Sequence, residues 1–321
     1  MRGRTRAFLW LLCGCLCLCG CAQHSSPLTR TSFLLDTTVT VTLYEGDTSL
    51  LDGCMEQIAW YEALFSRTVK GSDVDRINHA AGEPVTVSQE TADLLRLALE
   101  VAALTDGALD ITVAPLVELW GFGEDPAVPD RAAVEQALGR VGYERVELAD
   151  NTVRLPAGMG VDLGAVAKGY IADRLREYLL ANGCHSAVID LGGNILTVGD
   201  KRGKPFTIGI ADPQETGQML CTIPVQDGAA VTSGSYQRYF EQDGKRYHHI
   251  LDPHTGFPAE SGLLSVTVLC GEAARADALS TACFVLGADR GWELIESLPG
   301  VEALFVREDG TQRRTSGFPA E

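Results

Sequence analysis

Three oxygen-bearing side chains in one apolar segment have the spacing of a cation site. In Ala276–Gly287, ADALSTACFVLG, Ser280 lies three residues and Thr281 four residues after Asp277. A helix would set all three on one face. Hard oxygen donors suit Mg²⁺, which keeps waters and shares its coordination shell with substrate phosphates. The alternative is structural: Asp277 would bond a neighbouring backbone turn, and the two hydroxyls would bond carbonyls of their own helix.

A second segment, Val161–Asp173 or VDLGAVAKGYIAD, has the pattern of an anion site. Asp162 and Gly164 fall at the end of an expected strand, directly before an expected helix, whose free N–H groups favour phosphate. Lys168 lies in the first helical turn, where a cation is unfavourable unless it faces a bound anion. A surface lysine beside a capping aspartate is the alternative. The DLGGN run, Asp190–Asn194, is a further turn where a ligand can approach the backbone.

A third segment, Ser233–Pro258, has the sequence SGSYQRYFEQDGKRYHHILDPHTGFP and lacks one clean apolar face. Aromatic rings come from Tyr236, Tyr239, Phe240 and Tyr247. His248 and His249 follow on a short apolar strand that Asp252-Pro253 ends. The pattern predicts a ligand-binding segment, although aromatic hairpin tips without a function are also common.

The N-terminus has the pattern of an export signal. A basic start is followed by the apolar run Phe8–Cys19 and by Leu18-Cys19-Gly20-Cys21, which resembles a lipobox. This predicts a lipoprotein signal peptide over residues 1–20, lipidation at Cys21, a lipid-anchored leash over 21–31 and a catalytic domain over 32–321. A membrane-spanning helix is the alternative, but the apolar run is shorter than the roughly 20 residues that a span needs. The expected location is therefore the extracytoplasmic face of a bacterial cell membrane.

The charge balance limits the partners. The chain has 43 acidic and 26 basic residues, a net charge of -17. So acidic a protein repels nucleic acid, and no nucleic-acid partner is expected. An anionic ligand would need a metal ion or a local cluster of donors. Five of the ten cysteines belong to the signal, and the others form no CxxC motif, so buried thiols are expected rather than a zinc or redox site.

The mixture of strands, helices and antiparallel hairpins predicts a single α+β domain with a mixed, largely antiparallel sheet and packed helices. The expected strands are Ser32–Tyr44, Ser186–Val198, Phe206–Ala211, Leu220–Val225, Leu263–Leu269 and Val301–Val306, with a hairpin in Arg145–Leu155. The expected helices are Ser49–Ser66, one that Ser88 caps and Asp106-Gly107 ends, Asp130–Val141, Ala165–Ala181, Ala273–Leu286 and Trp292–Ser297.

With these motifs in this order, the chain resembles the FAD:protein FMN transferases, the ApbE family. The resemblance extends from about Phe33 onward and rests on VDLGAVAKGYIAD, DLGGNI, SGSYQRYF, HHILDPHTGFP, ADALSTA and DGALDITVAPLVELWGFG. It implies an enzyme that binds FAD as substrate and Mg²⁺ as cofactor, moves FMN onto a Thr or Ser hydroxyl of a partner flavoprotein, and releases AMP. Implied acceptors are subunits of membrane redox complexes of the Rnf or sodium-pumping quinone reductase type, or extracellular flavoproteins.

The resemblance also implies site residues. The positions that match flavin contacts are Leu35, Thr68, Ala108, Leu109, Asp110, Asp162, Lys168 and Leu251. Two of them depart from the family pattern, since Thr68 replaces a frequent Tyr and Leu35 a frequent Met. The implied metal ligands are Asp277, Thr281, the Ala165 carbonyl and Ser280, which stands where some relatives have a second Asp. His249 and Asp277 are the implied catalytic residues.

Two other functions remain open. Water as the acceptor would make an FAD pyrophosphatase that yields FMN and AMP. A non-catalytic flavin-binding lipoprotein is the other alternative, but it would not need the ADALSTA metal face. The chain has no acceptor motif of the Asp-x-x-(Ser/Ala)-Gly-Ala-Thr type, so a transferase of this sequence would modify a partner rather than itself.

Overall fold

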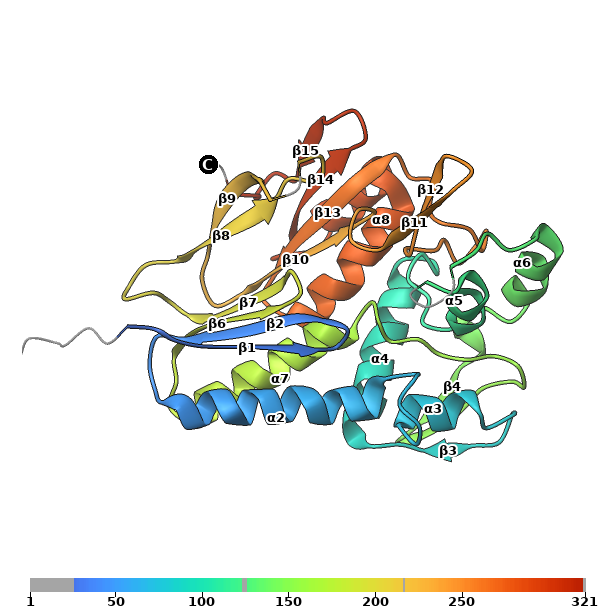
Figure 1. Cartoon of the computed structure of the whole chain (residues 1–321), viewed down its shortest axis with the longest axis horizontal. Helices are drawn as coiled ribbons and strands as arrows, with labels where there is room; N and C mark the ends of the chain where they lie inside the picture. The colour runs from blue at the N-terminus through green and yellow to red at the C-terminus, as the bar shows by residue number, and fades with distance from the viewer. Residues whose placement is uncertain (1–25, 123–125, 216, 320–321) are drawn as a thin grey trace, which may run out of the picture.

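An eight-stranded antiparallel sheet forms the centre of the computed structural model, which describes residues 26–122, 126–215 and 217–319 (Figure 1). In spatial order its strands are β1 (Leu28–Leu34), β2 (Thr37–Leu43), β6 (Ser186–Leu191), β7 (Asn194–Gly199), β10 (Ala229–Gly234), β13 (Leu263–Cys270), β14 (Glu302–Arg307) and β15 (Gln312–Arg314). Every neighbouring pair in this sheet is antiparallel. The predicted α+β class with a largely antiparallel sheet is therefore confirmed.

Helices pack on one face of this sheet and, with its inward side chains, enclose the main core (Figure 1). The helices that contact the sheet are α2 (Thr48–Phe65), α7 (Ala167–Ala181) and α8 (Ala273–Glu296), while α3 (Asp73–Asn78) packs on α2 and α4 (Gln89–Leu104) on α8. The short helices α5 (Ala114–Trp120) and α6 (Arg131–Leu138) form a separate apolar cluster to the side. Several begin at side-chain caps: Asp47 caps α2, Ser88 caps α4 as predicted, and Asp130 caps α6. No helix in the described ranges is both long and apolar enough to cross a bilayer.

Smaller strand pairs cover the remaining surfaces. The hairpin of β8 (Phe206–Ala211) and β9 (Met219–Val225) packs its apolar side chains against the sheet face opposite the helices. A second hairpin, β11 (Tyr239–Gln242) and β12 (Lys245–His248), lies beside α5 and α6 (Figure 1). A three-stranded sheet joins β3 (Val85–Thr86), β5 (Thr152–Arg154) and β4 (Glu147–Ala149).

Two predicted strands are each two strands in the structure. Ser32–Tyr44 contains the turn between β1 and β2, where Leu35 and Asp36 have φ angles of 55° and 54°. Ser186–Val198 contains the turn between β6 and β7 at Gly192-Gly193. Alternating Thr and Val does not reveal a two-residue turn, because no Gly or Asn marks it in the first case.

Other boundaries also differ from the predictions. Strand β1 begins at Leu28, so the folded domain starts inside the predicted leash 21–31 rather than at residue 32. Helix α7 begins at Ala167, not Ala165. The two predicted C-terminal helices form the single element α8, kinked at Gly287. The central strand β10 and the short helices α3 and α5 were not predicted. The predicted signal peptide and Cys21 lie outside the described residues.

Candidate active site

The carboxyl group of Asp277 is buried under the sheet and has one strong hydrogen-bond partner. Asp277 lies on α8 with 4% exposure, and its Oδ2 accepts the backbone N–H of Gly169 at 3.0 Å. Burial raises the pKa of Asp277 from 3.8 to about 6, while the Lys168 charge, the Gly169 N–H and the neighbouring Asn194 amide act in the opposite direction. A buried, under-partnered carboxylate of this kind favours a bound cation.

The VDLGAVAKGYIAD segment brings α7 against the start of α8. A Cβ added to Gly169 would lie 2.2 Å from the Ala273 carbonyl oxygen, so glycine permits the close approach. Asp173, which ends the motif, accepts the backbone N–H groups of Ala273 at 3.1 Å and Ala274 at 2.9 Å. Asp173 thereby satisfies the first N–H groups of α8, whose N-cap residue makes no side-chain bond. The motif thus fixes the helix that carries Asp277.

The backbone carbonyl of Ala165, which the family resemblance implies as a metal ligand, lies just before the first turn of α7. Gly169 gives its N–H to Asp277, and within the described part of the chain no hydrogen bond reaches the Ala165 carbonyl. Lys168 is half-buried, and in the same ranges its ammonium forms no hydrogen bond or ion pair. Burial raises the pKa of Asp277 and Asp190 and lowers that of His249, and the Lys168 charge opposes the first two shifts and adds to the third. Lys168 is therefore the point where three of the sequence motifs meet.

Hydroxyl groups from two elements lie beside Asp277. The Ser233 Oγ on β10 is 2.8 Å from the Ser280 Oγ and 3.2 Å from the Thr281 Oγ1, both on α8. Ser280 is fully buried and donates to the Asp277 carbonyl at 2.9 Å. Ser280 therefore supports the helix and Ser233, and its hydrogen bonds do not support the predicted role as an open metal ligand. Thr281 remains half-exposed. Ser233 belongs to the SGSYQRYF motif, but its contact with α8 joins segments far apart in the chain and was not predicted.

The two adjacent histidines face different surroundings. His248 Nε2 lies 3.2 Å from the Ala259 carbonyl, and its ring contacts Phe284 edge-on. His249 Nδ1 lies 3.1 Å from the Arg238 carbonyl, which also accepts the His249 backbone N–H at 3.0 Å. Because a carbonyl only accepts, Nδ1 carries the proton and Nε2 of a neutral ring keeps its lone pair. Burial lowers the pKa of His249 to about 4, so the ring is neutral at pH 7.

Asp162 is held by an arginine that the sequence analysis did not identify. Asp162 Oδ2 lies 2.9 Å from the Nε of Arg67, and its Oδ1 accepts the Gly164 N–H at 2.8 Å. Its backbone N–H donates to the Ile111 carbonyl at 2.7 Å, which joins this turn to the segment that follows Asp110. Thr68 follows Arg67 in the chain, so the two predicted flavin contacts Thr68 and Asp162 lie near each other. No spacing in the sequence links Arg67 to a turn 95 residues later.

Most of the other residues predicted to contact the flavin are buried or already hydrogen-bonded to protein groups. Asp110 Oδ1 accepts the N–H and hydroxyl of Thr112, and its Oδ2 accepts the Tyr143 N–H, so protein donors occupy both oxygens. Burial raises the pKa of Asp110. Ala108, Leu109 and Leu251 are buried. Leu35 occupies the β1–β2 turn, where its N–H donates to Glu62.

The aromatic run has a different role from the one its composition indicated. Phe240 and Tyr247 stack on each other across the β11–β12 hairpin, with ring centroids 5.4 Å apart. Both also contact Trp120 on α5, and the three rings anchor the hairpin to the α5–α6 region. These faces are core rather than open ligand surface. The exposed Tyr239 ring is covered by Arg246, whose guanidinium lies 4.0 Å from the ring centroid.

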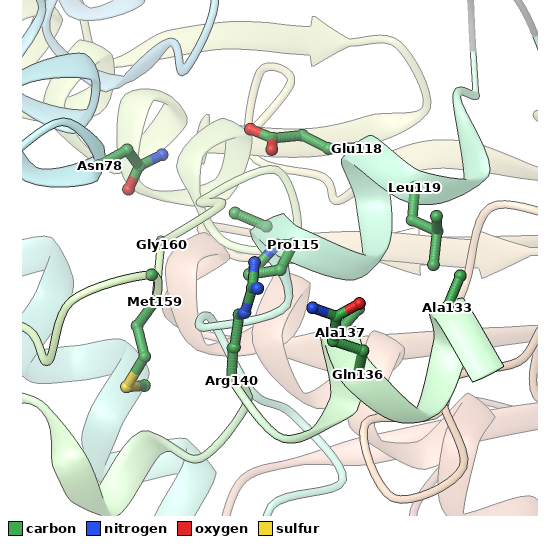
Figure 2. Close-up of a pocket in the computed structure, with 12 residues that line it drawn as sticks. Asn78, Pro115, Glu118, Leu119, Ala133, Gln136, Ala137, Arg140, Met159 and Gly160 are labelled. Carbon is green, nitrogen blue, oxygen red and sulfur yellow. The ribbon is translucent and has the colours of Figure 1, made fainter. Parts of the chain in front are cut away.

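A surface pocket of about 460 Å³ lies between α5, α6 and the loop before Val161 (Figure 2). Figure 2 shows Arg140 and Gln136 from the α6 side, and Glu118 from α5, among its lining residues. None of the site residues predicted from the sequence lines it. The pocket is therefore separate from the group around Lys168 and Asp277.

Comparisons with known proteins agree with the geometry. The ApbE family model matches residues 35–305. An FAD:protein FMN transferase of Treponema pallidum is 41% identical over 277 residues, which span 80% of this chain and 76% of that protein. A Klebsiella pneumoniae protein of the same name is 38% identical over 282 residues, spanning 86% and 88%.

Solved structures show the same fold. The ApbE protein of Thermotoga maritima is 36% identical with a TM-score of 0.86, covering 92% of this chain and 100% of that one. The flavin transferase ApbE of Vibrio cholerae is 30% identical with a TM-score of 0.83, covering 91% and 98%. With a family match over most of its length and relatives of this similarity, the chain belongs to the ApbE family of FAD:protein FMN transferases.

Proposed function

We propose that this enzyme transfers FMN from FAD to a Thr or Ser hydroxyl of a partner flavoprotein, releases AMP, and depends on Mg²⁺. The observation that carries the proposal is the meeting of three motifs at Lys168. Its ammonium, which has no hydrogen-bond or ion-pair partner in the described part of the chain, influences Asp277 of ADALSTA, Asp190 of DLGGNI and His249 of HHILDP. A cation without a protein partner among acidic groups is well placed for an anionic substrate such as a pyrophosphate.

The residues present fit a magnesium ion. Asp277 supplies a buried carboxylate, Thr281 a half-exposed hydroxyl, and Ala165 a carbonyl that receives no backbone hydrogen bond in the described structure. Oxygen donors of these types are the ones Mg²⁺ takes, with waters and substrate phosphates filling the other positions. No cluster of three or more His, Cys, Asp or Glu side chains in the described ranges could hold a metal instead. When bound, Mg²⁺ would neutralise charge on the pyrophosphate.

His249 is the residue suited to take the acceptor's proton. In the reaction, the acceptor oxygen forms a bond to the phosphorus on the FMN side, and the bond from that phosphorus to the bridging oxygen of AMP breaks. The acceptor hydroxyl loses one proton in this exchange. Nε2 of the neutral His249 ring has a free lone pair, since Nδ1–H is directed to the Arg238 carbonyl. Lys168 would bind the phosphate oxygens and hold them in place during the transfer.

We also propose where the enzyme works. Lipidation at Cys21 would hold it on the extracytoplasmic face of the bacterial cell membrane, close to membrane-bound acceptors. Acceptor subunits of the Rnf or sodium-pumping quinone reductase type, and extracellular flavoproteins, are the proposed partners. The basic start, the apolar run and the lipobox-like sequence support this location.

The deciding experiment measures the mass of a candidate acceptor after incubation with the enzyme, FAD and Mg²⁺. We expect the acceptor to gain one FMN and an equal amount of AMP to appear. His249→Gln should lose the adduct, whereas Glu118→Gln at the separate pocket should retain it. Free FMN and AMP without an adduct would instead show an FAD pyrophosphatase. Binding of FAD with neither product would show a non-catalytic flavin-binding protein.

A further inference from the structure

A buried amide in this site forms no hydrogen bond of normal length within the described part of the chain. Asn194 is 1% exposed, and neither its Oδ1 nor its Nδ2 lies within 3.5 Å of a suitably placed partner in those ranges. Buried polar side chains are nearly always satisfied, and an amide with both atoms unpaired is rare in a folded protein. Such a side chain indicates a group that the protein binds at this point.

The sheet directs Asn194 toward Asp277. Asn194 begins β7 directly after the Gly192-Gly193 turn, and it pairs with Val231 of β10. Paired residues of an antiparallel ladder point to the same face, and Val231 is part of the core that α8 covers. Ser233 lies two residues further on this face and contacts α8. The Asn194 amide also lies within reach of the Asp277 carboxylate, toward which its N–H groups can donate.

We propose that Asn194 completes the cation site, with its amide oxygen toward Mg²⁺ and its amide N–H groups toward the Asp277 carboxylate. The proposal rests on the Mg²⁺ dependence proposed above. Amide oxygens are accepted ligands of hard cations, and they add no charge. The hydroxyl of Ser280 is already engaged with the Ser233 hydroxyl and the Asp277 carbonyl, and Asp277 is the one carboxylate among the proposed ligands. Asn194 supplies a further oxygen without placing a second negative charge beside Asp277.

The test measures metal binding directly. MgCl₂ is titrated into metal-stripped protein by calorimetry, with and without FAD, and the melting temperature is recorded with and without Mg²⁺. We expect Asn194→Ala to weaken Mg²⁺ binding 10- to 100-fold, roughly the effect of removing a residue that orients a metal ligand. The matched control is Thr197→Val on the same strand. Thr197 is buried too, but its hydroxyl bonds Gly228, so its loss should affect melting and leave Mg²⁺ affinity unchanged.

Asn194→Asp gives a second, isosteric test if the alanine variant folds poorly. A carboxylate beside Asp277 should lower the metal-free melting temperature at pH 8 and enlarge the increase that Mg²⁺ produces. A lower metal-free melting temperature in both variants with unchanged Mg²⁺ affinity would show a structural amide and overturn the inference. If the wild-type protein bound no Mg²⁺ in either titration, the metal dependence itself would fail. FMN transfer by the wild type with normal Mg²⁺ binding by Asn194→Ala would remove this inference alone.

Discussion

Replacing Asp277 by Asn should stabilise the metal-free protein at alkaline pH while abolishing its response to Mg²⁺. Burial raises the pKa of Asp277 to about 6 from its ordinary value of 3.8. Between these two values the folded state binds more protons than the unfolded state, so this group's contribution to stability falls as the pH rises. Above pH 6 the ionised carboxylate is a constant cost to the fold. Asn removes the charge, and its oxygen can still accept the Gly169 N–H.

The pKa shift of Asp277 sets the size of the expected stabilisation. A difference of about two pKa units between the folded and unfolded states corresponds to about 3 kcal/mol in the free energy of unfolding. For a domain of this size, the unfolding entropy converts that free energy into an increase in melting temperature on the order of 5 °C. The increase should appear in full at pH 8 in EDTA and fall to roughly a third at pH 4.5, where the folded carboxyl is protonated but most of the unfolded chains are still ionised. Mg²⁺ should raise the melting temperature of the wild type at pH 8 but not that of Asp277→Asn.

Differential scanning calorimetry of the two proteins at both pH values, with EDTA and with Mg²⁺, provides the measurement. His249, whose pKa is lowered to about 4, also makes stability pH-dependent, but with the opposite sign, since the unfolded state takes up its proton first as the pH falls. The difference between mutant and wild type removes that contribution. An equal loss of stability at both pH values would refute the reasoning, because it would make the carboxylate a structural acceptor.

Asp173 is the matched contrast to Asp277. Burial raises the pKa of Asp173 as well, but two backbone N–H groups and Arg176 act in the opposite direction and satisfy both of its oxygens. Asp173→Asn replaces one acceptor oxygen by a donor, so an N–H of α8 loses its acceptor and Arg176 loses its charged partner while keeping its bond to the Gly271 carbonyl. It should lower stability by about 1–3 kcal/mol at pH 8. If Asp277→Asn raises and Asp173→Asn lowers the free energy of unfolding, then protein donors compensate the charge of Asp173 but not that of Asp277.

Three further outcomes are expected. Thr281→Val should reduce Mg²⁺-dependent turnover less than Asp277→Asn does, because a neutral ligand compensates less charge; equal losses in initial rate would contradict this. His249→Gln should lower the rate of adduct formation by a factor of about 10²–10⁴ with FAD affinity retained, and fluorescence titration that showed lost affinity would point to a binding role instead. Cys21→Ser should release the protein from membranes or leave it unprocessed, and unchanged fractionation would disprove lipidation.

The fold class was predictable because its signals are local. Ser88 caps α4, and Asp106-Gly107 ends it, since such caps and stops depend on a few adjacent residues. The β1–β2 turn was missed because the turn residues Leu35 and Asp36 adopt positive φ without glycine. Strand β10 was missed for a different reason. Its sequence AAVTSG is short and consists mostly of residues with small side chains, so only its position between β7 and β13 shows that it is a central strand.

The sequence predicted the candidate site correctly where the residues concerned lie within one short motif. The placing of Asp277 and Thr281 on one helix face follows from their spacing, and the structure bears it out. Contacts between distant segments were not accessible in this way. The bond from Gly169 to Asp277 spans 108 residues, and the pair of Arg67 with Asp162 joins the end of α2 to a turn before α7. Aromatic residues gave a false signal, because Phe240 and Tyr247 serve a core equally well.

A site with one carboxylate has a consequence for how substrate and metal bind. Asp277 provides the single negative charge among the proposed ligands, since Ala165, Thr281 and Asn194 contribute neutral oxygens. One charge holds Mg²⁺ weakly, and this ion prefers to complete its shell with waters and phosphate oxygens. If the proposed site binds Mg²⁺, the pyrophosphate of FAD would become part of the metal site, and Mg²⁺ would in turn offset the repulsion between that anion and a protein of charge -17. Thermodynamic linkage makes the coupling reciprocal: FAD must tighten Mg²⁺ binding by the factor by which Mg²⁺ tightens FAD binding.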